Sequence, residues 1–207
     1  VVIIGGDGGT DDIGMGALSG MFERGHDITY ICYNNEAYMN TGVQRSSATP
    51  VGASTMTTPI GAVSWGKERP TKNLPAIALA HDIPYVATAS IAYPQDLERK
   101  VKQALSIAGP KYLEIHCPCP IGWGFDAART VELAKLAVQS GLMPLYEARP
   151  GQPLKVRNIN KVRPVAEYLR LQKRFRHLFA QTEEAAEHLA AIQSIADDNI
   201  SRYGLVD

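Results

Sequence analysis

Apolar and polar positions along the chain divide it into short β-branched runs and longer stretches with helical spacing. Val1 to Ile4 is fully apolar and predicts a buried strand. In Asp12 to Arg24, apolar residues recur every three or four positions, which predicts a helix that Gly25 ends. Asp27 to Tyr33 is a second β-rich apolar run. A strand, a helix and a second strand in this order predict a parallel βαβ unit.

The same alternation continues through the rest of the chain. The segment 40–73 is rich in Thr, Ser, Gly and Pro and has no sustained periodicity, which is typical of a functional or a disordered loop. Further helices are expected over 74–81, 94–108 and 126–140, strands over 85–90 and 111–116, a hairpin over 146–156, and two last helices over 164–179 and 182–203. The fold class is therefore α/β, with a doubly wound, mostly parallel sheet and a helical C-terminal tail. We place the main domain at 1–160 and the helical extension at 161–207.

Composition narrows the functional classes. The 207 residues carry 21 Lys and Arg against 21 Asp and Glu, so the formal charge is zero and a nucleic-acid partner is not expected. No apolar run approaches the roughly 20 residues of a membrane helix, and there is no secretory signal. Three cysteines are too few for a disulfide framework and indicate a reducing compartment, so the cytoplasm is expected. The apolar start without a methionine indicates the later part of a longer chain.

Two nucleotide-binding motifs fail when tested against the sequence. The dinucleotide fingerprint G-x-G-x-x-G begins at Gly6, but its last position is Asp11. The segment from Gly61 to Lys67 matches G-x-x-x-x-G-K, but Glu68 follows instead of Ser or Thr, and no apolar strand precedes it. We interpret the second match as a coincidence.

The loop from Gly5 to Gly9 carries an acidic residue where nucleotide loops carry small ones. Glycine lets backbone N–H groups approach an anion, but Asp7 would repel a bare phosphate. A divalent cation such as Mg²⁺ resolves the conflict, because it binds carboxylate and phosphate oxygens together. Asn35 follows the next strand, at the same carboxyl edge of the predicted sheet, and is the candidate second ligand.

These residues resemble the thiamine diphosphate motif of a known enzyme family. Gly6-Asp7-Gly8 together with the run from Asn34 to Gly42 (NNEAYMNTG) is similar to the 2-oxoacid:ferredoxin oxidoreductases, of the pyruvate:ferredoxin oxidoreductase or pyruvate synthase type. The likeness continues through 44–50, 85–89 and 118–123, and so covers most of residues 1–160. It implies the thiamine diphosphate-binding fold and identifies the chain as similar to the family's thiamine-binding β subunit.

The resemblance also implies roles for individual residues. Asp7, the Asn35 side chain and the Ala37 backbone carbonyl would bind Mg²⁺, while Gly6, Gly8 and Gly9 would face the diphosphate of the cofactor. Asn40 matches an asparagine beside the reactive carbon of thiamine, and Thr41 is its neighbour; both are candidate catalytic residues. Glu36 has no assigned role. The thiamine ring stabilises the charge left when a 2-oxoacid loses CO₂.

Electrons leave this family's active site through iron-sulfur clusters. Cys119 matches the separate fourth ligand of a 4Fe-4S cluster whose other cysteines lie upstream of the first motif. Cys117 is less favoured, and Cys32 lies in a predicted buried strand and is expected in the core. The implied partners are α-, γ- and δ-type subunits, ferredoxin, coenzyme A and the 2-oxoacid. The basic cluster 173–177 is expected to be a solvated face over a packed one, with a subunit contact as the alternative.

The expected activity is the oxidative decarboxylation of pyruvate with coenzyme A to acetyl-CoA, CO₂ and reduced ferredoxin. Oxalate and branched-chain 2-oxoacids stay open as substrates. A thiamine decarboxylase or carboligase without redox chemistry is a second interpretation, and it requires no cluster at Cys119. A third is a non-catalytic subunit that binds a metal diphosphate or serves assembly.

Overall fold

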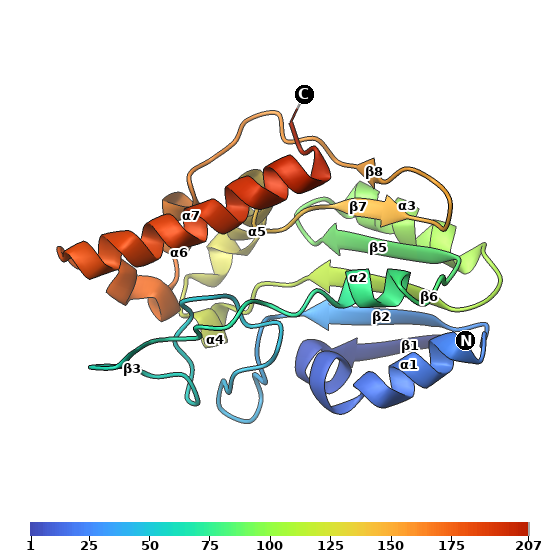
Figure 1. Ribbon diagram of the computed structural model, residues 1–207, viewed down its shortest axis with the longest axis horizontal. Coiled ribbons are helices and arrows are strands. Elements are labelled where there is room, and N and C mark those ends of the chain that lie inside the picture. Colours follow the sequence, from blue (N-terminus) through green and yellow to red (C-terminus); the bar gives the residue numbers. More distant parts are fainter. Residues whose placement is uncertain (207) are drawn as a thin grey trace.

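A six-stranded sheet forms the centre of the computed structural model, which describes residues 1–206. The strand order is β1-β2-β6-β5-β7-β8 (Figure 1). The strands are β1 (Val2–Gly6), β2 (Thr29–Asn34), β5 (Tyr85–Ser90), β6 (Lys111–His116), β7 (Tyr146–Ala148) and β8 (Lys155–Val156). The first four strands in this order are parallel, and β7 and β8 are antiparallel to their neighbours. The mostly parallel sheet and the hairpin at its edge are thus confirmed.

Helices cover both faces of the sheet, which makes the fold doubly wound. Helices α1 (Met15–Glu23) and α2 (Leu74–Leu79) pack on one face, where Phe22 and Leu74 join Cys32 and Tyr112 in one apolar cluster. Helix α3 (Pro94–Leu105) packs on the other face, against β5 and β6 (Figure 1). The expectation that Cys32 is a core residue is confirmed, since it is fully buried.

A second apolar core lies beyond the carboxyl ends of the strands. It is built by α4 (Pro120–Trp123), α5 (Thr130–Gln139), α6 (Val165–Leu169), η3 (Lys173–Phe179) and α7 (Glu183–Tyr203). The short helix η2 (Ala127–Arg129) comes directly before α5 and has no buried residue. Trp123 and Phe175 are buried at its centre. The Thr182 hydroxyl accepts a hydrogen bond from the Ala185 N–H and so caps α7, as the sequence predicts.

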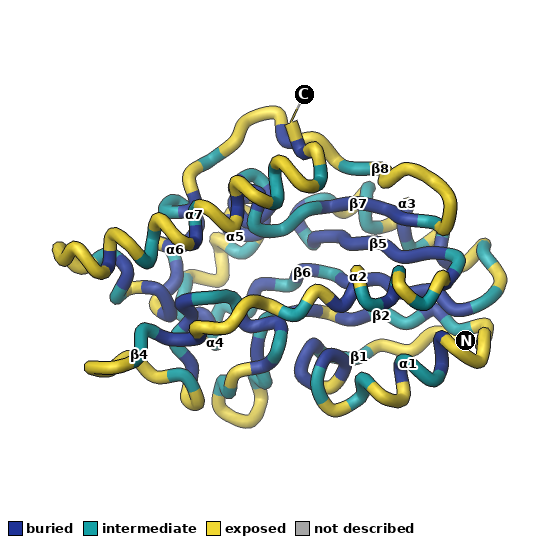
Figure 2. Tube along the Cα trace, in the orientation of Figure 1, coloured by how far each residue is buried: buried dark blue, intermediate teal, exposed yellow. Residues whose placement is uncertain are grey.

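Three expectations about the elements are wrong. Strand β1 lies at the edge of the sheet and its apolar side chains are exposed, with Ile4 at 65% (Figure 2). The helix expected over 164–179 is two short helices, because Gln172 has an extended backbone between them that turns Arg174 inward. The segment 40–73 contains a small hairpin, β3 (Ile60–Gly61) and β4 (Ser64–Trp65), which the composition does not reveal.

The register of the sheet brings three chain segments to one edge. Gly6 pairs with Tyr33, and Asn34 pairs with His116, so β1, β2 and β6 end side by side. Asp7, Asn35 and Cys117 therefore begin the three loops at this edge, where ligands of open α/β sheets bind. Asp7 itself leads from β1 into η1 (Gly8–Ile13), a single π-helical turn that comes before α1. Within residues 1–206, no helix is both long and apolar enough to cross a membrane.

Candidate metal and diphosphate site

Asp7 lies at the centre of the candidate site. Its side chain is almost fully buried, and the carboxylate accepts hydrogen bonds from the Ser46 hydroxyl at 2.5 Å and from the Asn35 N–H at 3.2 Å. Burial raises the pKa of Asp7 to about 6, although these two hydrogen bonds oppose the shift. A buried carboxylate with so few donors is suited to bind a cation.

The amide of Asn35 faces two other oxygens. Its side-chain oxygen lies 3.0 Å from Oδ1 of Asp7 and 2.8 Å from the carbonyl oxygen of Ala37, with no donor between them. Neighbouring ligands of an octahedral Mg²⁺ ion are about 2.8–3.0 Å apart, because each metal–oxygen bond is about 2.0–2.1 Å long. In the opposite orientation, the amide nitrogen of Asn35 would donate a hydrogen bond to each of these two oxygens. The three oxygens thus fit a small hard cation.

These oxygens come from a carboxylate, an amide and a backbone carbonyl. Within residues 1–206, no group of three or more His, Cys, Asp or Glu side chains could hold a metal ion. A search for side chains that commonly bind metals would therefore miss this site. The structure brings Asp7, Asn35 and Ala37 together, as the motif requires; their role as ligands remains a prediction.

The glycines of the loop have different surroundings. A Cβ on Gly8 would lie 2.4 Å from the ring of Tyr38, whose hydroxyl donates to the Gly8 carbonyl at 2.9 Å. Gly6 lies beside the ring of Tyr33, at 3.5 Å for an added Cβ, and Gly9 faces open space. Gly8 is thus required by close packing, and Gly9 leaves room for a ligand. The predicted contact of all three with a diphosphate remains a prediction.

Asn40 and Thr41 lie at an exposed tip of the same loop. Both residues are exposed, and the Asn40 side chain makes no hydrogen bond to any other residue of 1–206. The Thr41 hydroxyl donates to Oε1 of Gln44 at 2.5 Å, and Nε2 of Gln44 donates to the Thr41 carbonyl at 2.7 Å. The tip therefore stays accessible, which its predicted contact with substrate requires.

Cys119 caps the short helix α4. Its Sγ accepts a hydrogen bond from the Gly122 N–H at 3.4 Å, and the thiol is partly exposed. The Cys117 N–H donates to the Asn34 carbonyl at 2.8 Å, and burial raises the pKa of the Cys117 thiol to about 11. Since thiolates bind iron, the raised pKa disfavours Cys117 as a ligand. Cluster binding at Cys119 remains a prediction.

Comparison with known proteins decides the family. Residues 1–115, more than half of the chain, match the family described as "Thiamine pyrophosphate enzyme, C-terminal TPP binding domain". The chain belongs to this family. It is 60% identical over 205 residues to the pyruvate synthase subunit PorB of Methanosarcina barkeri, a match that covers 99% of this chain and 69% of that subunit.

Other relatives place this thiamine pyrophosphate enzyme among the 2-oxoacid:ferredoxin oxidoreductases, as the motifs predict. The chain is 48% identical over 193 residues to the ketoisovalerate oxidoreductase subunit VorB of Pyrococcus furiosus, covering 91% of this chain and 61% of VorB. A solved 2-oxoglutarate:ferredoxin oxidoreductase from Magnetococcus marinus has a TM-score of 0.51 at 26% identity, over 65% of this chain and 52% of its own. The chain thus spans about two thirds of the curated relatives and about half of the solved chain.

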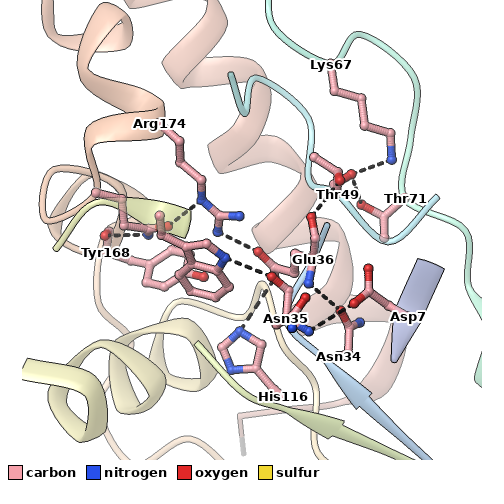
Figure 3. A network of polar contacts seen from close by, with 12 residues as sticks. Asp7, Asn34, Asn35, Glu36, Thr49, Lys67, Thr71, His116, Tyr168 and Arg174 are labelled. Atoms are coloured by element: carbon pink, nitrogen blue, oxygen red, sulfur yellow. Dashed lines mark hydrogen bonds and ion pairs between the residues drawn. The ribbon is translucent and has the colours of Figure 1, made fainter. Parts of the chain in front are cut away.

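Sequence analysis of this thiamine pyrophosphate enzyme misses the residues that support the loop. The Thr49 hydroxyl donates to the Glu36 carbonyl at 2.6 Å, and the ammonium of the buried Lys67 donates to the Thr49 carbonyl (Figure 3). The same ammonium donates to the Ser47 carbonyl. Burial lowers the pKa of Lys67 to about 8. Lys67 is the lysine of the G-x-x-x-x-G-K match, and its contacts with carbonyls agree with interpreting that match as a coincidence. No local signal separates these residues from other loop residues.

Proposed function

We propose that the chain is the thiamine diphosphate-binding β subunit of a pyruvate synthase. The reaction is the oxidation of pyruvate with coenzyme A to acetyl-CoA and CO₂, with electrons passed to ferredoxin. The observation that carries this proposal is the convergence of the Asp7, Asn35 and Ala37 oxygens inside the matched thiamine-binding segment. The names of the relatives that are 53–60% identical over nearly the whole chain support pyruvate as the substrate.

Asp7, the Asn35 amide oxygen and the Ala37 carbonyl would hold Mg²⁺ in this proposal. The ion lets a diphosphate lie beside a buried carboxylate, because it offsets the repulsion between two anions. Gly6, Gly8 and Gly9 would surround the diphosphate. Thiamine diphosphate, when bound, supplies the electron sink that the loss of CO₂ from a 2-oxoacid requires.

The exposed tip of the loop, Asn40 and Thr41, would contact the substrate. Asn40 offers an amide that can donate to, or accept from, an oxygen of the bound 2-oxoacid, and Thr41 offers a hydroxyl. Neither side chain is tied to the metal half of the loop, so both can adjust to a ligand.

Cys119 would bind a 4Fe-4S cluster together with cysteines from outside this sequence. The test compares iron content in the intact complex, where Cys119→Ser should lose the iron of one cluster and Cys117→Ser should retain it. Equal iron in both variants would reject Cys119 as a ligand. A non-redox thiamine decarboxylase would contain no iron in any of these samples.

The remaining assignments follow from the same family. The partners would be α-, γ- and δ-type subunits, ferredoxin and coenzyme A, and the compartment would be the cytoplasm. Identity of 48% to VorB keeps 2-oxoisovalerate as a second candidate substrate.

The decisive experiment measures viologen reduction by the intact complex. We expect pyruvate with coenzyme A to give the highest kcat/KM, above 2-oxoisovalerate and oxalate, and omission of coenzyme A to abolish the rate. Higher kcat/KM for 2-oxoisovalerate would replace pyruvate by the branched-chain substrate. No turnover with any of the three would reject the proposed activity.

A further inference from the structure

Glu36 joins two of the proposed metal ligands in a strained backbone. It lies between Asn35 and Ala37 with a φ of 66°, a left-handed conformation that is unfavourable for a residue with a Cβ. Such strain persists where surrounding contacts hold it, and it is common at binding sites. The contacts of Glu36 therefore decide how the two ligands are presented.

The carboxylate of Glu36 is held by a cation from the far end of the chain. Nη2 of Arg174, in η3, lies 2.5 Å from Oε2 of Glu36, and Nε2 of His116 lies 3.5 Å from Oε1 (Figure 3). Arg174 is itself buried, although the basic cluster that contains it was expected to be solvated. That expectation holds for the exposed Lys173 and Arg176 and is wrong for Arg174.

Further contacts fix the orientation of the Arg174 guanidinium. Its Nε donates to Oε1 of Gln172 at 2.8 Å, and its Cζ lies 3.7 Å from the centre of the Trp123 ring. The same indole donates from Nε1 to the Asn35 carbonyl at 2.8 Å. Arg174 thus packs against the ring that holds Asn35 and pairs with the side chain that follows Asn35.

The backbone of this turn has few free polar groups. The Glu36 N–H donates to Oδ1 of Asn34 at 2.9 Å, and the Glu36 carbonyl accepts from the Thr49 hydroxyl. The Ala37 carbonyl receives no hydrogen bond from residues 1–206 other than from the Asn35 amide in its alternative orientation. The supporting contacts hold the turn and leave the candidate ligand oxygen available.

We propose that Arg174 is a positioning residue for the metal site, acting through Glu36 and Trp123. This inference rests on the proposed function. Removal of the guanidinium leaves Glu36 without its main partner, so the turn relaxes toward negative φ and the Ala37 carbonyl turns away from Asp7. Cation binding must then restore the turn, and its affinity falls by that cost. The C-terminal segment thereby sets the metal affinity of a site at the other end of the chain.

The test measures cofactor uptake by the full-length subunit in its complex. The complex is freed of cofactor with chelator and titrated with Mg²⁺ at a fixed thiamine diphosphate concentration, and bound thiamine is quantified after rapid desalting. We expect Arg174→Gln to raise the Mg²⁺ concentration for half-maximal uptake at least tenfold, a range typical of residues that support metal ligands. Saturating Mg²⁺ should restore uptake, because the ligands themselves remain.

Arg99→Gln is the matched control. Arg99 also pairs with a largely buried glutamate, Glu147, at 2.6 Å, and it makes no contact with the metal loop. The Arg99→Gln substitution should lower the thermal midpoint of the complex without changing its Mg²⁺ requirement for cofactor uptake. If Arg99→Gln and Arg174→Gln change the Mg²⁺ requirement equally, Arg174 has only a structural role and the proposal fails.

A double variant tests the route through Glu36 and covers failure of the single variant to fold. Glu36→Gln with Arg174→Gln leaves no unpaired buried charge. It should need as much Mg²⁺ as Arg174→Gln alone, because both changes break the same link. Trp123→Phe should have a smaller effect, about threefold, since it removes the N–H donor and part of the ring but leaves the Arg174–Glu36 pair in place. A double variant with the wild-type Mg²⁺ requirement overturns the proposal.

The two proposals fail differently in this experiment. If the wild-type complex takes up no thiamine diphosphate at any Mg²⁺ concentration, the proposed function is wrong. If the wild type binds cofactor with Mg²⁺, and Arg174→Gln, the double variant and Trp123→Phe all follow the wild-type titration curve, only the role of Arg174 is wrong.

Discussion

The loop over residues 34–42 has two halves that differ in their hydrogen bonds and in their exposure. In residues 34–38, side chains from distant segments hold the loop. The side chains that contact it directly are those of Asp7, Thr49, Trp123 and Arg174. Ser46 in turn donates to the Asp7 carboxylate. In residues 39–42, side-chain hydrogen bonds within residues 1–206 join only Thr41 to Gln44, three positions away. The first half is largely buried and the tip is largely exposed.

The difference separates two tasks within one motif. A cation site needs oxygens at fixed separations, and rigid support provides them before the ion binds. A substrate contact must form and break in each turnover, so a tip with few contacts is suitable. We therefore expect substitutions in the first half to affect cofactor uptake and substitutions at the tip to affect turnover.

The largest effect should come from Asp7→Asn. The change removes the only negative charge among the three converging oxygens, and we expect uptake of thiamine diphosphate at a given Mg²⁺ concentration to fall by more than about 100-fold. Bound thiamine after desalting measures it. Asp12→Asn is the control, because Asp12 lies in the π-helical turn that follows Asp7 and its carboxylate accepts from the Ser47 N–H at 3.0 Å. Equal losses in both variants would contradict a specific role for Asp7.

Asn40→Ala should separate the two halves most clearly. We expect kcat/KM for pyruvate to fall by about 100-fold, the loss typical for removal of one hydrogen-bond donor in an active site. The Mg²⁺ requirement for cofactor uptake should not change, because the Asn40 side chain is exposed and makes no hydrogen bond to any other residue of 1–206. A raised Mg²⁺ requirement would show that the tip and the metal half are one unit.

The sequence predicts the ligands of this site better than it predicts their support. Asp7 and Asn35 follow apolar runs that are recognisable as adjacent parallel strands, so their meeting at one edge follows from topology. Arg174 stands in a run of basic residues that has the pattern of a solvated face. Its burial depends on the extended backbone at Gln172, and only long-range packing of Trp123 and Phe175 determines it.

Dependence on long-range contacts also explains the errors in the predicted fold. Apolar β-branched composition predicts the strand Val2–Gly6 but not its position at the sheet edge, which depends on pairing partners. The break after Leu169 and the hairpin at Ile60–Trp65 also arise from contacts between distant segments. Local pattern therefore gives the elements, and tertiary contacts decide their ends and exposure.

A third prediction concerns the stability of the turn that follows Asp7. Asp11 is fully buried and neither of its carboxylate oxygens has a hydrogen-bond partner among residues 1–206. Burial, and secondarily the charge of Glu114, raises its pKa to about 8. The unfolded state binds fewer protons than the folded state above about pH 4, so stability falls as the pH rises toward about 8. Asp11→Asn removes this loss.

Thermal or urea unfolding at several pH values tests whether stability falls as the pH rises. Between about pH 5 and 7, the free energy of unfolding of Asp11→Asn should gain about 1–3 kcal/mol relative to wild type. The exposed Glu98→Gln should give no such rise, since Glu98 pairs with Lys102 at the surface. A constant difference between Asp11→Asn and wild type across this range would show that Asp11 is ionised in the folded protein.

The smallest effect should come from Gln44→Ala, which removes both hydrogen bonds between the tip and its own base. An exposed hydrogen bond contributes about 0.5–1.5 kcal/mol at most, so we expect KM for pyruvate to rise about two- to fivefold through greater freedom of Asn40 and Thr41. The Mg²⁺ requirement should be that of wild type, because within residues 1–206 the Gln44 side chain hydrogen-bonds only to Thr41. A change in cofactor uptake larger than the change in KM would mean that the tip helps to hold the metal half, and the division of the loop would be wrong.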